Sequence, residues 1–172
     1  WLMAQAGMSA LGHVTLEMSP AAGMPWTWFV VQSDHPLQAC YLSQAAHWPV
    51  RMGDYSAMGS GPACLLNPEL MLCETYQFQE SSEVAVLVLE TRVLPDDAVC
   101  RQLASACRVR PDHFAVIVAP TARLAGTVQI AARSVETGLH KLHQLGVDLR
   151  TICQGMGRCP VAPAGADDLF SL

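Results

Sequence analysis

Apolar and polar positions in the first part of the chain predict two strands and a helix. Residues 13–18 alternate between the two classes, as a half-buried strand does, and residues 26–32 are aromatic and β-branched, which is typical of a buried strand. Asp34 lies just before Pro36, a residue that suits the first turn of a helix. We therefore expect Asp34 to cap a helix over about residues 37–46.

The pattern breaks down over residues 48–68, where glycine and proline punctuate the chain. We expect a long ordered loop here, or a strand followed by loops. Long irregular segments in a compact domain are often functional, so this part is a candidate binding segment.

A more regular order of strands and helices follows in the second half. The continuous apolar stretches 84–90 and 113–118 are predicted strands, and residues 147–153 are a third. Between them, Pro95 and two aspartates open a helix that ends near residue 108, and a helix over residues 127–145 is closed by Gly146. Residues 70–79 are ambiguous.

This alternation of strands and helices predicts an α/β fold, with a mixed or parallel sheet and packed helices. Continuous apolar strands are typical of a parallel layer with right-handed crossovers. We predict a first α/β part over residues 1–68, with the glycine-rich segment, and a second over residues 69–172, with the helix over residues 127–145. The length of 172 residues suffices for a sizeable core.

Composition narrows the class of protein. Apolar residues make up 51% of the chain and charged residues only 15%, which suggests buried partner surface. The net charge of −5, without a block of lysine or arginine, argues against a nucleic-acid surface. The longest apolar run, residues 84–89, is too short to cross a membrane.

Seven cysteines are scattered along the chain, and none forms a CxxC pair. An odd count without tight pairs fits neither a secreted disulfide framework nor a structural zinc site. We expect buried, reduced thiols in a cytoplasmic protein, and the first residues lack the pattern of a signal peptide.

The helix over residues 127–145 carries the main candidate chemistry. At about 100° per residue, its polar side chains lie on one flank of the apolar stripe and include Gln129, Arg133 and Glu136. Arg133 and Glu136 are three residues apart, and a partly buried glutamate beside an arginine stays ionised and can orient a water as a base. The alternative is an ordinary surface ion pair, which contributes little.

His140 and His143 lie on the same flank with the spacing of a metal pair, and Glu136 is a possible third ligand. A fourth ligand is not evident, and the HExxH arrangement is absent. Solvated or lightly paired histidines are the better interpretation, so we predict no metal site.

Gly59, Ser60 and Gly61 offer backbone N–H groups and a hydroxyl that can line an anion or a ligand carbonyl, or else form a plain turn. The segment is neither a P-loop nor a nucleophile elbow. Just before it, Tyr55 adds an aromatic ring. A helix start explains Asp34 beside His35, and Asp167 with Asp168 fits a solvated turn.

Five motifs occur together in order: SDHPLQACYLSQ, VRMGDYSAMGSGPA, VLVLETRVLPDDAV, IVAPTARLAGTVQIAARSVETGLHKLHQLG and PVAPAGADD. This set resembles the methenyltetrahydromethanopterin cyclohydrolases of one-carbon metabolism, in their bacterial form. The resemblance covers nearly all of this chain but only the middle of the family's sequence. We therefore expect a partial sequence that lacks N-terminal and C-terminal portions.

The resemblance implies reversible hydrolysis of the methenyl bridge of a tetrahydropterin to the N-formyl compound. It implies a cyclohydrolase-type fold, part of a two-domain enzyme, a pterin one-carbon substrate, no metal or redox cofactor, and a homo-oligomer with a trimer favoured. Arg133 and Glu136 match the family's catalytic pair in ARxVETGxHKL. The remaining substrate-binding candidates are Tyr55, Gly59, Ser60, Gly61, Pro120, Thr121 and Gln129.

The chemistry of the residues fits this role. A methenyl carbon is an amidinium-like cation that needs only a placed water and a group to take its proton. Three positions depart from the family: Cys64 stands where an arginine is frequent, and Arg158 and Cys159 precede PVAP. The alternative function is a non-catalytic relative, or an inactive fragment, that binds a pterin or is purely structural.

Overall fold

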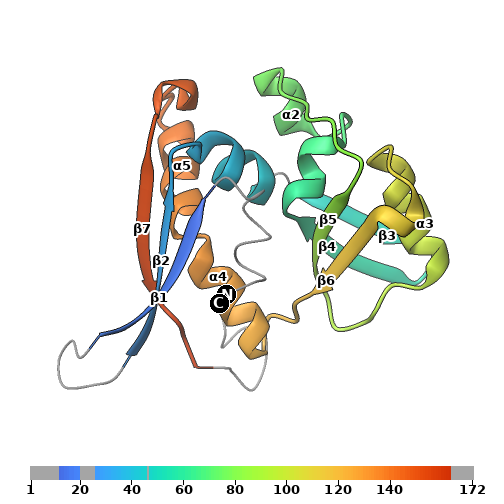
Figure 1. Ribbon diagram of the computed structural model, residues 1–172, viewed down its shortest axis with the longest axis horizontal. Helices are drawn as coiled ribbons and strands as arrows, with labels where there is room; N and C mark the ends of the chain where they lie inside the picture. Colours follow the sequence, from blue (N-terminus) through green and yellow to red (C-terminus); the bar gives the residue numbers. More distant parts are fainter. Residues whose placement is uncertain (1–11, 20–25, 46, 164–172) are drawn as a thin grey trace.

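Two separate sheets organise the computed structural model, which describes residues 12–19, 26–45 and 47–163 (Figure 1). The first has strand order β1-β2-β7, with antiparallel pairing throughout. The second has order β3-β4-β5-β6; its first two pairings are antiparallel, and β5 pairs with β6 in parallel. The predicted α/β class with a mixed sheet is confirmed. The strands are β1 His13–Ser19, β2 Trp26–Ser33, β3 Trp48–Met52, β4 Tyr55–Ser60, β5 Ala85–Glu90, β6 Phe114–Val118 and β7 Gly155–Pro160.

Helices and short helical turns connect the strands. The α-helices are α2 Met71–Tyr76, α3 Asp97–Ala106, α4 Leu124–Ala132 and α5 Ser134–Gln144. A π-helical turn, η2, spans Leu37–Leu42, and three 3-10 turns are η3 Pro62–Leu66, η4 Pro111–His113 and η5 Leu149–Thr151.

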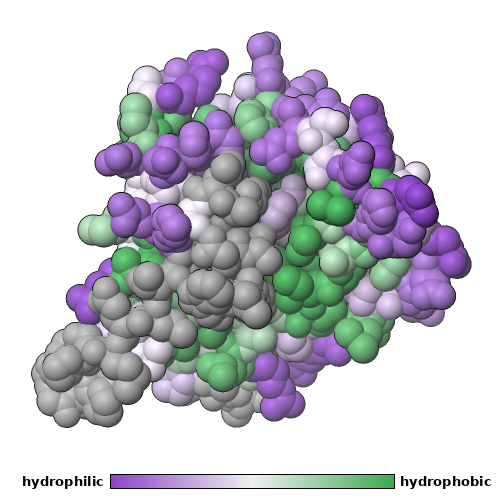
Figure 2. Space-filling model, in the orientation of Figure 1, coloured by the Kyte–Doolittle hydropathy of each residue, from purple (hydrophilic) through white to green (hydrophobic). Residues whose placement is uncertain are grey.

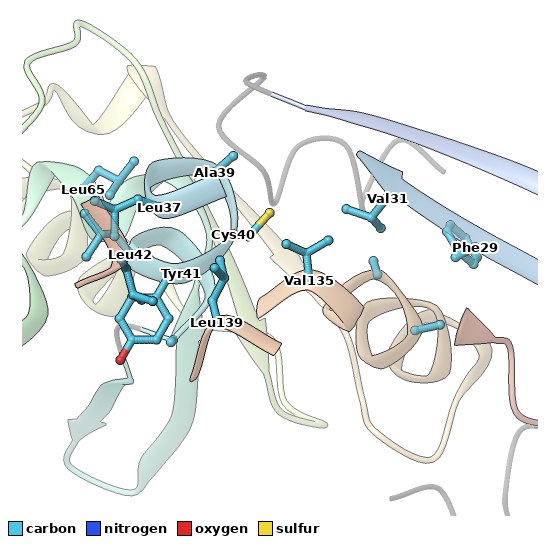
Figure 3. Close-up of a cluster of buried hydrophobic side chains, with 14 residues drawn as sticks. Phe29, Val31, Leu37, Ala39, Cys40, Tyr41, Leu42, Leu65, Val135 and Leu139 are labelled. Carbon is cyan, nitrogen blue, oxygen red and sulfur yellow. The ribbon is translucent and has the colours of Figure 1, made fainter. Parts of the chain in front are cut away.

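The first hydrophobic core lies between the β1-β2-β7 sheet and the helical segments η2, α4 and α5. Figure 3 shows Val31 of β2, Cys40 of η2 and Val135 of α5 pointing toward one another. Phe29, Tyr41 and Leu139 extend the same buried cluster. These side chains anchor α5, and with it the candidate pair, to a strand far away in sequence.

The second core lies on one face of the β3-β4-β5-β6 sheet. Leu87 and Leu89 of β5 are buried against Val99 and Leu103 of α3. Asp96 caps α3 by accepting from the Val99 N–H at 2.8 Å, which confirms the predicted opening of this helix. Side chains alternate between the two faces of a strand, so Met58 of β4 points to the opposite face of this sheet and is exposed.

Apolar residues also form part of the molecular surface, in the region where β4, β5 and β6 lie (Figure 2).

Four predictions of local structure are wrong. Residues 48–60 form a hairpin, β3 and β4, whose two-residue turn uses the positive φ of Gly53. The segment 147–153 contains η5, and the next strand, β7, joins the other sheet. Asp34 does not cap η2: Pro36 is the cap residue, and the Ser33 hydroxyl accepts from the His35 N–H. The fourth is the single helix over residues 127–145, which is divided into α4 and α5.

The predicted end of the first helix, at residue 46, lies outside the described residues. The division of the chain at residue 68 stays a prediction; the second sheet takes strands from both sides of this position. Within the described ranges, no helix is long and apolar enough to cross a membrane.

Candidate active site

An ion pair marks the point where α4 gives way to α5. Arg133 lies between the two helices with φ −90° and ψ 12°, and its Nε donates to Oε2 of Glu136 at 3.2 Å. The Glu136 side chain is only 9% exposed, against 26% for Arg133. The carboxylate is therefore buried beside a cation, which distinguishes this pair from an exposed ion pair on a helix surface.

Close packing on β7 accompanies the interruption of the helix. A Cβ atom added to Gly157 would overlap the Ser134 side chain, so β7 passes directly against the first turn of α5. The Thr137 hydroxyl donates to the Arg133 carbonyl at 3.1 Å. We infer that tertiary contacts to β7, which are invisible in the local pattern, interrupt the helix at Arg133.

Gln44, two residues after η2, holds Arg133 from the other side. The Nη2 atom of Arg133 donates to the backbone carbonyl of Gln44 at 2.9 Å. Carbonyls at a helix end lack partners within the helix and are free to accept such bonds. The guanidinium group thus joins Gln44 to Glu136, and its position is defined by contacts at both ends.

The glycine-rich segment approaches the same place. Gly61 has a φ of 100°, which favours glycine, and its N–H donates to the Ser43 carbonyl at 2.6 Å. The side-chain amide of Gln129 on α4 donates to the Ser60 hydroxyl at 3.4 Å. Ser60 and Gly61 are therefore tied both to α4 and to the residue beside Gln44.

Pro120 and Thr121 follow the end of β6 and lie against the start of α4. The Thr121 hydroxyl donates to Oε1 of Glu90, at the end of the adjacent strand β5. A hollow of about 680 Å³ opens beside this contact; its lining includes Glu90, Thr121 and Arg51. Thr121 precedes α4, Gln129 lies on it and Arg133 follows it, so these residues are spread in a row along a helix of nine residues, roughly 13 Å long.

Tyr55 is not brought together with these residues. It lies at the opposite end of β4 from Ser60, roughly 17 Å away along a strand that rises about 3.4 Å per residue. Its ring packs against the second core, where burial raises the pKa of the phenol. Gly59 faces Trp48 of β3, where an added Cβ would make a tight contact of 3.2 Å. A substrate contact from Tyr55 or Gly59 stays a prediction.

The charge of Glu136 acts on its buried neighbours. Burial, and then the nearby Glu136 charge, raises the pKa of the Cys40 thiol to about 12. Burial likewise raises the pKa of Tyr41, with smaller contributions from Tyr76 and Glu136. The Cys40 thiol therefore stays protonated at neutral pH and is no nucleophile.

All seven cysteines are unpaired, as predicted, but only four are buried: Cys40, Cys64, Cys73 and Cys107. Cys153 is exposed, and Cys100 and Cys159 are half-buried. Arg158 stacks over the Trp28 ring, with Cζ 4.7 Å from its centroid. Among the three positions that differ from the family's usual residues, Cys64 lies in the second core, and Arg158 and Cys159 lie on β7.

The two candidate metal histidines have other partners. His143 Nδ1 is 2.9 Å from the Tyr76 hydroxyl, and His140 Nε2 is 3.0 Å from the Gln144 amide. Across the described residues, no group of three or more His, Cys, Asp or Glu side chains is placed to hold a metal ion. Asp34 and His35 form an exposed pair, and Asp167 and Asp168 lie outside the described residues.

Three residues at this site are not predicted from the sequence pattern: Ser43, Gln44 and Glu90. Ser43 and Gln44 contribute backbone carbonyls, which leave no mark in the side-chain pattern. Glu90 ends an apolar strand, β5, at the same sheet edge where the parallel strand β6 ends. A polar residue at this position is a sequence signal for a binding site.

Chemically, the site offers a buried carboxylate, a fixed guanidinium and a row of neutral donors and acceptors. A carboxylate held in this way can take a proton from a water and attract a cationic carbon. The arrangement supports addition of water to an electrophile.

Comparison with known proteins identifies related sequences. Residues 1–172 match the family model described as Cyclohydrolase (MCH). The methenyltetrahydromethanopterin cyclohydrolase of Methanosarcina mazei is 40% identical over 165 residues, covering 95% of this chain and 50% of that protein. That of Methanococcoides burtonii is 44% identical over 140 residues, covering 80% and 43%. That of Xanthobacter autotrophicus is 37% identical over 171 residues, covering 99% and 50%. The chain spans about half the length of these relatives.

Proposed function

Because this chain belongs to the Cyclohydrolase (MCH) family, we propose that it hydrolyses the methenyl bridge of methenyltetrahydromethanopterin, reversibly, to the N-formyl compound. The observation that carries the proposal is the buried carboxylate of Glu136, held 3.2 Å from Arg133. Relatives with this name match nearly the whole chain, including the segment that contains the pair.

In the proposed reaction, Glu136 acts as the general base. The oxygen of a water forms a bond to the methenyl carbon while Glu136 accepts one of its protons. The resulting carbinol loses its hydroxyl proton as the C=O bond forms, and one C–N bond breaks as that nitrogen gains a proton. A cationic substrate becomes a neutral product, so one proton is released per turnover.

Arg133 serves this step by positioning. Its contact with the Gln44 carbonyl fixes the guanidinium, which in turn aims Glu136. A guanidinium is always charged, so Arg133 also stabilises negative charge that develops on the attacking oxygen.

Substrate contacts are proposed for Ser60, Gly61, Gln129, Pro120 and Thr121 along α4, and for Gly59 and Tyr55 nearer the second core. We also propose that no metal or redox cofactor takes part, because an amidinium carbon is already electrophilic. Unpaired thiols favour a reducing compartment, the cytoplasm. A homo-oligomer, with a trimer favoured, completes the proposal and is checked by light scattering.

The test follows the methenyl absorbance after the chain is added to methenyltetrahydromethanopterin. We expect Glu136→Gln to lower kcat by at least about 100-fold, the usual range for loss of a general base. Glu74→Gln is the matched control, because Glu74 is an exposed glutamate outside this site, and its activity should equal that of the unmodified chain.

A loss of only a few-fold in Glu136→Gln would contradict the role of this residue as base. If the unmodified chain neither binds nor hydrolyses the pterin, the proposed function fails. Binding without turnover would instead support the non-catalytic alternative.

A further inference from the structure

The side-chain oxygen of Gln44 is buried beside the candidate site without a hydrogen-bond partner. Gln44 is only 6% exposed, and its Oε1 atom has no partner among the described residues. A buried acceptor without a partner destabilises a fold, because its bonds to water are lost on folding and not replaced. An unpartnered buried atom at a candidate site needs an explanation, and the Ser134 hydroxyl beside Arg133 is a second one.

The surroundings of Gln44 are the elements that assemble the site. Its own backbone carbonyl accepts from Arg133, and the carbonyl of the preceding residue, Ser43, accepts from Gly61. Both backbone bonds are independent of the glutamine side chain. The backbone of Gln44 therefore builds the site, while its side-chain oxygen accepts no hydrogen bond from the described part of the chain.

Gln44 lies two residues after the π-helical turn η2, with Ser43 between them. The Ser43 hydroxyl has a partner, because it donates to the Ala39 carbonyl at 2.6 Å. π-helical turns occur frequently at functional sites, and η2 leads directly into the two residues, Ser43 and Gln44, that contact the site. The unpartnered oxygen thus belongs to the residue whose backbone carbonyl holds Arg133.

We propose that Gln44 Oε1 accepts a hydrogen bond from the bound substrate complex and thereby positions it against Glu136. This inference rests on the proposed function. The donor is an N–H of the pterin or an O–H of the attacking water, since both present a proton to a carbonyl acceptor. A water that gives one O–H to Glu136 and the other to Gln44 would direct its lone pair at the methenyl carbon.

The experiment compares Gln44→Met with Gln38→Met, its matched control on the same helical segment. Methionine keeps the length of glutamine but removes the acceptor, and the backbone carbonyl that holds Arg133 is retained. Thermal unfolding is measured without substrate, and kcat and KM are measured with methenyltetrahydromethanopterin. We expect Gln44→Met to keep or raise the unfolding temperature while kcat/KM falls by roughly 10-fold, as a lost hydrogen bond to a bound group requires.

The separate effects on KM and kcat identify the group that donates to Gln44. A raised KM with unchanged kcat assigns the pterin N–H, and a lowered kcat with unchanged KM assigns the attacking water. Unchanged kinetics would overturn the inference, and so would a clear fall in unfolding temperature, because that would reveal a structural partner for the oxygen. If the unmodified chain shows no turnover, the proposed function fails, and a pterin titration of both variants still tests the contact.

Discussion

At the scale of single residues, Arg133 decides the geometry of the site. Its guanidinium contacts the Gln44 carbonyl, 89 positions earlier in the chain, and the Glu136 carboxylate three positions later. One planar group with several fixed N–H donors makes both bonds at once, which a lysine ammonium on a flexible stem does not reproduce. The planar geometry of the Arg133 guanidinium, more than its charge, therefore determines these two contacts.

Replacement of Arg133 by lysine tests this statement. We expect Arg133→Lys to lower kcat by roughly 10- to 100-fold, because Glu136 loses its fixed partner although the positive charge stays. Arg123→Lys, an exposed arginine before the start of α4, is the control and should be neutral. Full activity in Arg133→Lys would show that charge alone suffices.

At the scale of elements, α4 is the segment that joins the row of site residues. It is pressed against the residues that follow β6: a Cβ on Gly126 would overlap the Pro120 carbonyl and the backbone of Thr121. Gly138 of α5 offers the contrast, since a Cβ there meets nothing within 4 Å. Close packing therefore requires a glycine at position 126, whereas the space around position 138 would accept a side chain.

The two glycines lead to opposite effects on stability. Gly126→Ala should lower the free energy of unfolding by roughly 1–3 kcal/mol, because α4 must move away from Pro120. Gly138→Ala should raise it by about 0.5–1 kcal/mol, since alanine favours an exposed helix interior. Urea denaturation of both variants measures the difference, and equal effects would contradict the close packing of α4.

At the scale of the whole molecule, two cores with buried thiols hold the fold. Cys40 belongs to the first cluster and Cys107 to the second, and burial raises the pKa of each thiol to about 12. A thiol in the unfolded chain is exposed to water and keeps its ordinary pKa of 9.0. The unfolded chain therefore loses these protons at a lower pH than the folded protein does.

Linkage turns this difference into a dependence of stability on pH. The contribution of each thiol is fully present below pH 9, the unfolded value, and is lost as the pH rises toward 12. The free energy of unfolding should fall by up to about 1.4 kcal/mol per pH unit for each such thiol. Urea midpoints between pH 8 and pH 11 check this slope, which Cys107→Ala should reduce; an unchanged slope would contradict burial of that thiol.

Some elements of this fold follow from the local pattern of residues, and others depend on distant contacts. The alternation of residues 13–18, the apolar strands near residues 84–90 and 113–118, and the capped helix after Pro95 were all legible locally. The hairpin over residues 48–60 could not be predicted locally, because its strands mix small, polar and apolar residues. Only Gly53 indicates its turn. Residues 147–153 form no strand, because the chain reaches its next partner, β2, only at Gly155.

The sequence by itself determined the α/β class, the family and the two side chains of the candidate pair. It did not determine that Arg133 interrupts a helix, that Glu136 is buried, or that Ser43 and Gln44 supply carbonyls to the site. Those features depend on contacts between segments tens of residues apart. A local pattern reports the burial of one face of a segment, whereas a backbone carbonyl is present at every residue, so only the tertiary structure decides which carbonyl meets Arg133.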